Sequence, residues 1–220
     1  MTLLRYGSQL EEIAAAEQGD GWLSACERDG RFLIPTEQFV EALGQFLRRL
    51  EAGPVLEVCA GGGELAAALR ATGVPVAATD ADPPSGAAVV RASAEEALRR
   101  YRPVVVLGCF VPVGAGVDPL VLGFPSVRHY VVLGARVGGV LGSPLLWRHP
   151  SWTAEPIEPL TRWMLTRHDA WIDRQTILRC GEAWHLRHRS VLAGCGACTT
   201  QDGKSCSSTV RDPPPTQAVA

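Results

Sequence analysis

The sequence predicts an α/β fold: a doubly wound, mostly parallel seven-stranded sheet with an antiparallel C-terminal hairpin, preceded by a helical segment. From Pro54 onward, short apolar runs alternate with helix-forming runs, which is typical of parallel strands joined by right-handed crossovers. The run at 104–107 is apolar throughout, as expected for a strand buried on both faces. Two segments near the C-terminus, 176–179 and 183–192, flank a Cys-Gly-Glu turn and predict the hairpin.

Residues 1–53 are expected to form a helical cap region. Segments 10–18 and 36–50 carry apolar residues at the spacing of an amphipathic helix. Thr36 stands where a helix N-cap belongs, because its hydroxyl can accept a hydrogen bond from a free N–H of the first turn. A glycine–proline pair then ends the second helix and leads into the first strand of the sheet.

The α/β domain itself is expected at residues 54–192. It opens with a strand at 55–58, a glycine-rich turn and a helix at 64–71. Residues 134–160 are rich in glycine and proline and therefore predict loops. The other expected elements are strands at 75–79, 87–91, 104–107 and 129–133, a helix at 94–100 capped by Ser93, a helix within 157–166, and the terminal strands 176–179 and 183–192.

The composition changes abruptly at the C-terminus. Gly, Ser, Thr, Cys and Pro dominate residues 193–220, and three consecutive prolines lie within them. Such a segment has too little apolar area to offset the entropy of ordering. We therefore expect residues 193–220 to be a disordered tail.

Charge and cysteine content exclude several classes of protein. The net charge of −2 gives no global basic field, so a nucleic-acid partner is not expected. No window reaches the roughly 20 apolar residues that span a bilayer, and no leader segment is apparent, so no membrane partner and a cytoplasmic location are expected. The seven cysteines, an odd number, are then expected to be free thiols. The oligomeric state is not indicated.

The glycine-rich turn after the first strand is the strongest functional signal. Glu57 is the acid near the end of this strand, and the turn Cys59-Ala60-Gly61-Gly62-Gly63 follows the strand. Glycines let a ligand approach bare backbone, and the helix start adds free N–H groups and a positive dipole end. An acid at the head of the turn repels phosphate but suits a hydroxyl or a cation. The pattern therefore favours a charged nucleoside cofactor.

Other strand ends are expected to meet the same site, because ligands of doubly wound sheets bind at the carboxyl ends of the strands. Asp80 stands at the second strand end, 23 residues after Glu57, and a carboxylate there can accept hydrogen bonds from both hydroxyls of a ribose. Ser93 and Ala94 are placed to meet a base edge. The candidate cofactor-binding residues are Glu57, Cys59, Ala60, Gly61, Gly63, Asp80, Ala81, Ser93, Ala94 and Cys109.

Over roughly residues 54–135 this arrangement resembles the class I S-adenosylmethionine-dependent methyltransferases, whose fold is Rossmann-like. Their first motif is an acid followed by three glycines at alternate positions; Glu57, Gly61 and Gly63 match it, and Cys59 replaces the first glycine. The resemblance implies S-adenosyl-L-methionine as the cofactor, with Glu57 near its methionine moiety and Asp80 on its ribose. It also places Ser93 and Ala94 beside the adenine.

Several alternatives stay open. The turn can be purely structural, or the site vestigial, as in a non-catalytic cofactor-binding or scaffold protein on the same fold. A nicotinamide dinucleotide site is disfavoured, because Gly-x-Gly-x-x-Gly is not matched and Glu57 would repel a pyrophosphate. The methyl acceptor can be a small molecule, which is the main hypothesis, or a protein or RNA.

The acceptor site is less well determined. The loop after the fourth strand, residues 109–114, lies where many of these enzymes meet their acceptor, and it lacks the Asn/Asp-Pro-Pro-aromatic motif of enzymes that act on nucleic-acid amines. No catalytic residue is predicted, because a sulfonium is already an activated leaving group and positioning alone can supply much of the acceleration. The candidate substrate-binding residues are Phe110, Pro112, Tyr6, Trp22 and His149.

A metal site is not expected. His185-x-x-His188 precedes Cys195-x-x-Cys198, and the latter has a zinc-type spacing. The two histidines, however, fall on opposite faces of the expected strand, and the cysteines lie in the polar tail.

Overall fold

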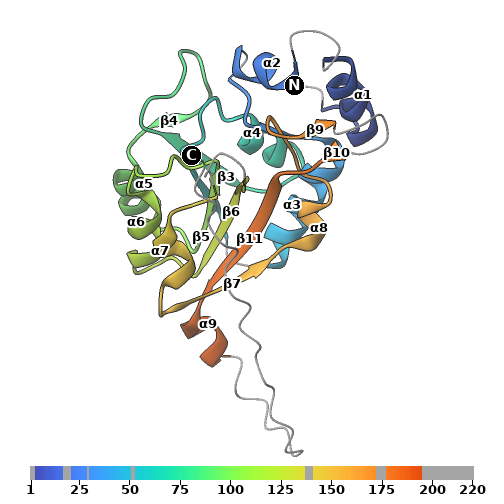
Figure 1. Cartoon of the computed structure of the whole chain (residues 1–220). Helices are drawn as coiled ribbons and strands as arrows, with labels where there is room; N and C mark the ends of the chain where they lie inside the picture. Colours follow the sequence, from blue (N-terminus) through green and yellow to red (C-terminus); the bar gives the residue numbers. More distant parts are fainter. Residues whose placement is uncertain are drawn as a thin grey trace, which may run out of the picture.

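The computed structural model describes residues 3–16, 21–28, 30–50, 53–136, 141–171 and 177–194 (Figure 1). Its centre is a seven-stranded sheet with helices on both faces. The expected disordered tail lies outside these residues, apart from its first two positions, which end helix α9 (Arg189–Gly194).

The sheet has the order β4-β3-β2-β5-β6-β11-β7. All neighbouring strands are parallel except β11, which runs antiparallel to both β6 and β7. The chain moves outward from β2 to β4 and then returns to β5 beside β2, so the topological switch point lies between β2 and β5. The strands are β2 (Val55–Val58), β3 (Val76–Asp80), β4 (Val90–Arg91), β5 (Val105–Cys109), β6 (His129–Ala135), β7 (Trp152–Pro156) and β11 (Gly181–His188).

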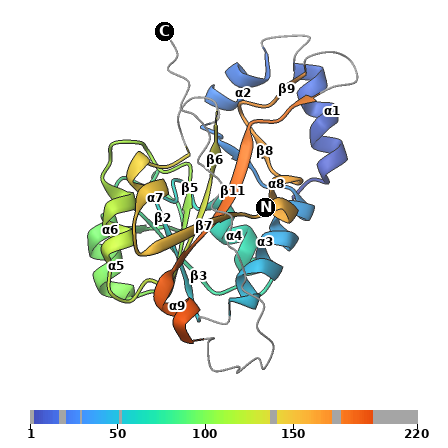
Figure 2. The same ribbon diagram turned by 60° about the horizontal axis from the view of Figure 1, so that its bottom comes forward.

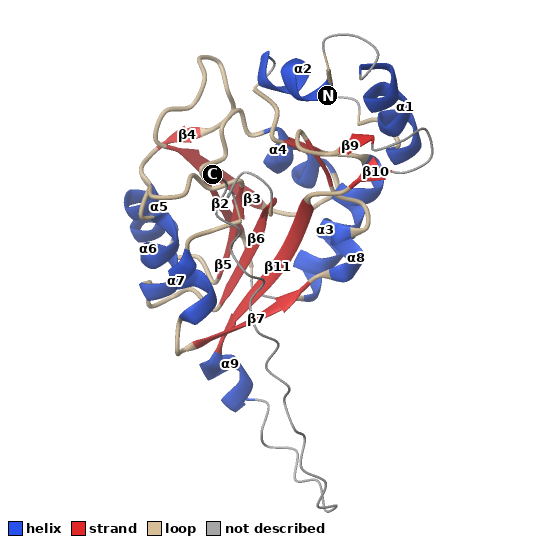
Figure 3. Cartoon of the chain, viewed as in Figure 1, coloured by secondary structure: helices blue, strands red, loops and turns tan. Residues whose placement is uncertain are grey.

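Helices cover the two faces of this sheet (Figure 3). On one face lie α3 (Glu37–Arg49), α4 (Glu64–Ala71) and α8 (Glu158–Thr161), and their core is continuous with Val55, Leu107 and Val131. On the other lie α5 (Ala94–Tyr101), α6 (Val117–Gly123) and α7 (Pro144–Arg148), around a second core with Leu56, Val106 and Tyr130. Successive side chains along each strand point to opposite faces of the sheet, so each strand contributes side chains to both cores.

The N-terminal segment lies over the carboxyl ends of the strands (Figures 1 and 2). It contains α1 (Tyr6–Ala16), α2 (Trp22–Arg28) and the two-residue strand β1 (Leu33–Ile34). β1 pairs antiparallel with β8 (Leu165–Thr166), far along the chain, and a small hairpin of β9 (Ala170–Trp171) and β10 (Ile177–Leu178) lies beside α1. We call the described residues from 3 to 35, which include α1, α2 and β1, together with β8, the lid.

Most expected elements are confirmed, including the N-caps. The hydroxyl of Thr36 accepts a hydrogen bond from the N–H of Phe39, and Ser93 forms a capping box with Glu96. The first strand and the helix that follows it have the predicted bounds. This agreement makes the chain a Rossmann-like α/β protein with a mostly parallel seven-stranded sheet.

Two expectations are wrong in the C-terminal third. The terminal strand is antiparallel as predicted, but its partners are β6 and β7 rather than the segment at 176–179, whose described part pairs with β9. β7 itself lies in a region expected to be loop. The helix predicted within 157–166 is only the short α8, because the backbone at Leu165 and Thr166 pairs with β1 instead. Both errors come from long-range pairing, which local patterns do not report.

Candidate functional site

A cavity of about 910 Å³ lies between the carboxyl ends of β2, β3 and β5 and the lid. This is the edge of the sheet at the switch point, where doubly wound proteins bind ligands. Residues of the glycine-rich turn form its floor, and residues 30–35 with the start of α1 form the opposite wall. Pockets for small molecules have volumes of about 300–1,000 Å³, so this one has room for a large ligand.

The glycine-rich turn has the backbone that a close ligand needs. Gly61 and Gly63 have positive φ values of 54° and 79°, a region that favours glycine. A Cβ on Gly61 would meet nothing within 4 Å, so this glycine faces open space in the cavity. A Cβ on Gly63 would lie 2.5 Å from Val89, so this glycine permits close packing of the turn. Gly61 therefore leaves space on the cavity side, whereas Gly63 allows the turn to pack against Val89.

Asp80 joins the end of β3 to this turn. One carboxylate oxygen accepts a hydrogen bond from the N–H of Gly61 at 2.9 Å, and the other accepts one from the N–H of Asp82, also at 2.9 Å. Each carboxylate oxygen has a second lone pair, so Asp80 can still accept two hydroxyl hydrogen bonds from the cavity side. The two backbone contacts fix the orientation of the carboxylate before any ligand binds.

Glu57 is a buried acid in the wall of the cavity, with 2% of its surface exposed. Burial raises its pKa to about 8, against weaker opposing effects of Arg70 and the backbone of Ala66. Its Oε2 atom has no hydrogen-bond partner among the described residues. An orphaned buried carboxyl oxygen costs free energy, so a ligand group that paired with Oε2 from the cavity would relieve this cost.

Two cysteines at adjacent strand ends also line the cavity. Cys59 has a positive φ of 55°, in the left-handed region that favours glycine. Burial raises the pKa of the Cys59 thiol to about 11, and Asp80 and Asp118 add to the effect. Burial likewise raises the pKa of Cys109, with Glu57 adding to it. Both groups are thus neutral thiols near pH 7, and neither is an activated nucleophile.

Aromatic side chains stand on the lid side of the cavity. Phe110, directly after β5, has a positive φ of 51°, which is strained for a bulky residue, and its N–H donates to the carbonyl of Leu133. Its ring lies 5.7 Å from the ring of Phe32 in the lid, at an angle of 45°. Pro112 completes this part of the wall, as predicted for the loop after the fourth strand of the parallel set.

The cavity brings together only part of the predicted residues. Glu57, Cys59, Ala60, Gly61, Asp80 and Cys109 line it, as do Phe110 and Pro112. Gly63, Ala81, Ser93 and Ala94 do not, and the Ser93 hydroxyl is engaged in the cap of α5.

Three substrate candidates lie elsewhere. Trp22 is packed in the core of the lid, where its indole N–H donates to the carbonyl of Thr166. The ring of Tyr6 packs edge-on against Trp163. His149 follows α7 at the opposite edge of the sheet, near the start of β6. None of the three lines the cavity.

Sequence reasoning predicted an N-terminal cap region and chose Tyr6 and Trp22 from it, but it missed the residues of this region that line the cavity. The helical spacing of residues 10–18 indicated a helix, but nothing in it pointed to the carboxyl ends of distant strands. Gly62, Glu64 and Leu65 at the start of α4 were missed as well, although the adjacent motif could have suggested them. The lid residues that line the cavity are Leu3, Leu4, Gln9, Glu12, Gly30, Arg31, Phe32, Leu33, Ile34 and Pro35.

Neither a metal site nor a membrane span is found in the described residues. No group of three or more His, Cys, Asp or Glu side chains there is arranged to hold a metal ion. His185 contacts His129 instead, with 3.0 Å between ring nitrogens, and Cys195 and Cys198 lie outside the described residues. Within the same ranges, every helix is too short or too polar to cross a bilayer.

Comparisons with known proteins find likeness in structure alone. No family pattern and no curated protein matches the sequence. Among solved structures, the 23S rRNA methyltransferase ErmE is 19% identical, with a TM-score of 0.45 over 72% of this chain and 70% of its own. The 1,6-didemethyltoxoflavin-N1-methyltransferase of Burkholderia thailandensis, crystallised with S-adenosylhomocysteine, is 18% identical, with a TM-score of 0.44 over 81% and 89%. The putative methyltransferase yhhF of Escherichia coli is 13% identical, with a TM-score of 0.41 over 70% and 88%. The likeness is one of fold.

Proposed function

We propose that this protein is an S-adenosyl-L-methionine-dependent methyltransferase that acts on a small molecule. One observation carries the proposal: Glu57, Gly61 and Asp80 come from separate positions in the chain and line one large cavity at the switch point of the sheet. In this reading Asp80 holds the ribose hydroxyls, and Gly61 lets the cofactor lie against backbone.

The residues present fit such a cofactor. The space in front of Gly61 is open, and Asp80 is oriented with acceptor capacity to spare. The unpartnered Oε2 of Glu57 suits a positively charged or hydrogen-bond-donating group. A pyrophosphate fits less well, since Glu64 and Asp80 both line the cavity.

The cofactor supplies a methyl group on a sulfonium, an activated electrophile. In the transfer, a lone pair of the acceptor forms a bond to the methyl carbon while the carbon–sulfur bond breaks; sulfur keeps the electron pair, and a proton on the acceptor passes to water. The chain's own part is to align the two reactants and to exclude solvent. The lid serves the second purpose, because it covers the carboxyl ends of the strands.

A small acceptor is favoured by this covered geometry. Two walls of the cavity come from the sheet and from the lid, so the acceptor must fit between them. The loop after β5 also lacks the motif of enzymes that act on nucleic-acid amines.

Isothermal titration with S-adenosylhomocysteine tests the cofactor assignment. Asp80→Ala removes two charge-assisted hydrogen bonds to the ribose, each worth about 1.5–3 kcal/mol, so the affinity should fall roughly a hundredfold or more. Asp82→Ala is the matched control, because this exposed neighbour contributes only its backbone N–H to Asp80. Absence of binding to the folded wild-type protein would remove the proposal.

A transfer assay tests turnover and the acceptor class. The protein is incubated with cell extract and methyl-labelled S-adenosylmethionine, and the label is followed into small-molecule, protein and RNA fractions. Label in the small-molecule fraction is expected. Label in RNA or protein would redirect the acceptor, and binding without any transfer would identify a scaffold on this fold.

A further inference from the structure

The outer part of the cavity differs in character from the part around the glycine-rich turn. Toward the sheet, the lining is polar and carries Glu57 and Asp80. Toward the lid, it is formed mainly by apolar groups, among them Phe32 and Phe110. A cofactor held by Asp80 occupies the first part, which leaves the second for another molecule.

Phe32 and Phe110 form an aromatic corner in this outer part. Phe110 is 7% exposed and is held in place by its strained backbone and its hydrogen bond to Leu133. Phe32 is 40% exposed, although its ring touches that of Phe110. Because Phe32 lines the cavity, a ligand ring packed beside it would bury this apolar surface and gain an aromatic contact.

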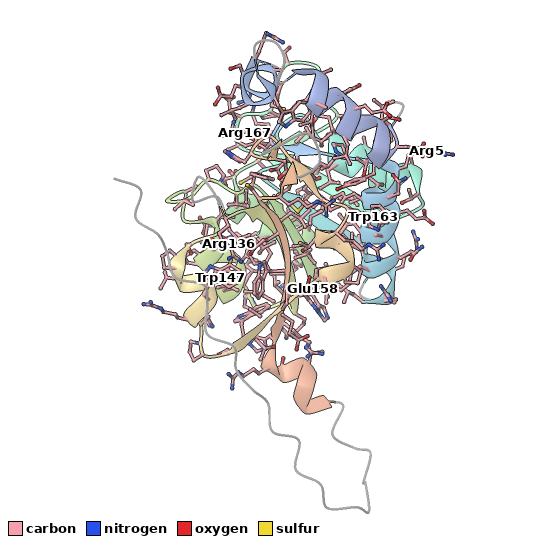
Figure 4. All side chains as sticks on the ribbon, turned by 45° about the vertical axis from the view of Figure 1, so that its right-hand side comes forward. Arg5, Arg136, Trp147, Glu158, Trp163 and Arg167 are labelled. Carbon is pink, nitrogen blue, oxygen red and sulfur yellow. The ribbon has the colours of Figure 1, made fainter. Side chains whose placement is uncertain are left out.

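Phe32 is fixed from outside the cavity by Arg167, the residue after β8. The guanidinium carbon of Arg167 lies 3.9 Å from the centre of the Phe32 ring, a cation–π contact, and the N–H of Arg167 donates to the carbonyl of Phe32 at 3.0 Å. Figure 4 shows Arg167 beside the N-terminal helices, at the end of the molecule that carries the lid. The ring is therefore held in one orientation from outside the cavity.

The charges that line the cavity as a whole disfavour anions. Among the described residues that line it, the acids ionised at neutral pH are Glu12, Glu64 and Asp80, and the one basic residue is Arg31; Glu57, with its raised pKa, is protonated there. A negatively charged ligand would meet net repulsion there, whereas a neutral or cationic one would not. The Gln9 side chain, hydrogen-bonded to Glu12, adds a polar group on α1.

We propose that the methyl acceptor is a flat aromatic or heteroaromatic molecule without negative charge, and that its ring packs against Phe32 and Phe110. That the bound molecule is the methyl acceptor rests on the proposed function. The aromatic binding site itself does not rest on it. Phe32 is the specificity residue that the lid contributes, and Arg167 positions it.

The test uses the full-length protein saturated with S-adenosylhomocysteine and three probes of one skeleton. These are 1-naphthol, which is flat and neutral; decahydro-1-naphthol, which is saturated; and 1-naphthalenesulfonate, which is flat and anionic. Affinities are measured by saturation-transfer NMR titration. We expect 1-naphthol to bind at least several-fold more tightly than either of the others.

Variants then locate the binding site. Phe32→Ala should weaken 1-naphthol binding roughly tenfold, because an aromatic contact and its buried area are lost. Phe32→Tyr keeps the ring and should retain the affinity. Leu23→Ala is the matched control, because Leu23 is an equally exposed apolar residue of the lid that does not line the cavity. The affinity for S-adenosylhomocysteine should stay the same in all three variants.

The outcomes separate the two proposals. Equal binding of the saturated and the flat probe, no binding of 1-naphthol, or no effect of Phe32→Ala would overturn the aromatic site. Tighter binding of the sulfonate would overturn the charge selection. If S-adenosylhomocysteine does not bind, the proposed function fails, and 1-naphthol titrated alone still tests the aromatic site. Methyl label that enters RNA would overturn the small aromatic acceptor.

Discussion

At the scale of single residues, Glu57 is the group in the candidate site whose burial is least offset by hydrogen bonds. It is buried, its pKa is about 8, and one of its oxygens has no partner among the described residues. Because its pKa lies above that of a free glutamate, the folded protein holds a proton there at neutral pH. The stability linked to this proton is present at low pH and is lost as the pH rises toward 8.

The protonation of Glu57 predicts a pH dependence of cofactor choice. From pH 6.5 to 9, the affinity for S-adenosylmethionine relative to S-adenosylhomocysteine should rise, because only the former carries the sulfonium charge that an ionised Glu57 attracts. An increase of roughly tenfold corresponds to two charges about 10 Å apart at an effective dielectric constant of about 20. Titration calorimetry with both ligands measures this ratio, and groups common to both cancel. Glu57→Gln should flatten the profile; an unchanged slope would contradict the role of this carboxyl.

A second residue, Asp169, is predicted to be structural. Its carboxylate is 1% exposed and accepts hydrogen bonds from the backbone N–H groups of Thr166 and Cys180, both at 2.8 Å. Asp169→Ala leaves these buried donors unpaired, which should cost about 2–4 kcal/mol in urea unfolding. The surface variant Asp82→Ala should stay within about 0.5 kcal/mol of wild type. A loss below about 1 kcal/mol for Asp169→Ala would show that water replaces the carboxylate.

At the scale of elements, Ser93 at the N-terminus of α5 was predicted to have two roles. The sequence suggested both a helix cap and an adenine contact for Ser93. In the structure its hydroxyl accepts a hydrogen bond from the N–H of Glu96, and the Glu96 carboxylate accepts one from the N–H of Ser93. The capping role is confirmed, and the adenine contact stays a prediction.

Ser93→Ala separates these roles. Loss of the cap should lower the free energy of unfolding by about 1 kcal/mol. Because Ser93 does not line the cavity, the affinity for S-adenosylhomocysteine should not change. A severalfold weaker affinity measured by titration calorimetry would instead support the adenine contact, and Thr36→Ala, at the N-cap of α3, gives a comparison for the loss of a cap alone.

The elements that the sequence predicted well are those with local causes. The strand before the turn, the helix after it and both N-caps follow from apolar runs, glycines and hydroxyl side chains close together in the chain. The pairing of β1 with β8 has no such signature, since Leu33 and Thr166 are brought together only by the fold. The same holds for the site: Asp80 was predictable from its strand end, whereas Phe32 was not.

At the scale of the whole molecule, β11 runs antiparallel to both of its neighbours in an otherwise parallel sheet. On β6 and β11, the antiparallel junction, the rings of His129 and His185 stack with 3.0 Å between nitrogens. Burial lowers the pKa of His185 to about 4, and the neighbouring His129 and Arg187 contribute. Burial also lowers the pKa of His129. This pair therefore resists protonation in the folded state.

Acid should weaken the fold through this pair. Stability linked to a lowered histidine pKa is present above about pH 6.5 and is lost as the pH falls toward 4, by at most about 1.4 kcal/mol per pH unit for each proton. Urea unfolding at a series of pH values measures the slope. His185→Gln keeps a polar amide beside His129, but the amide cannot titrate. The free energy of unfolding of this variant should therefore change less steeply with pH than that of the wild type. His149→Gln, in the turn after α7, serves as the control, and equal slopes in all three proteins would refute the assignment.

The lid is built from two distant stretches of the chain. Residues before α3 supply α1, α2 and β1, while β8 and Arg167 come from beyond β7. Any exchange of acceptor preference between proteins of this design must therefore transplant two segments together. A foreign N-terminal segment grafted alone would remove β1, the pairing partner of β8. It would also remove the indole of Trp22, which donates a hydrogen bond to the carbonyl of Thr166. On the proposal that Phe32 selects the acceptor, this selection depends on both segments, since β1 and β8 fold only as a pair.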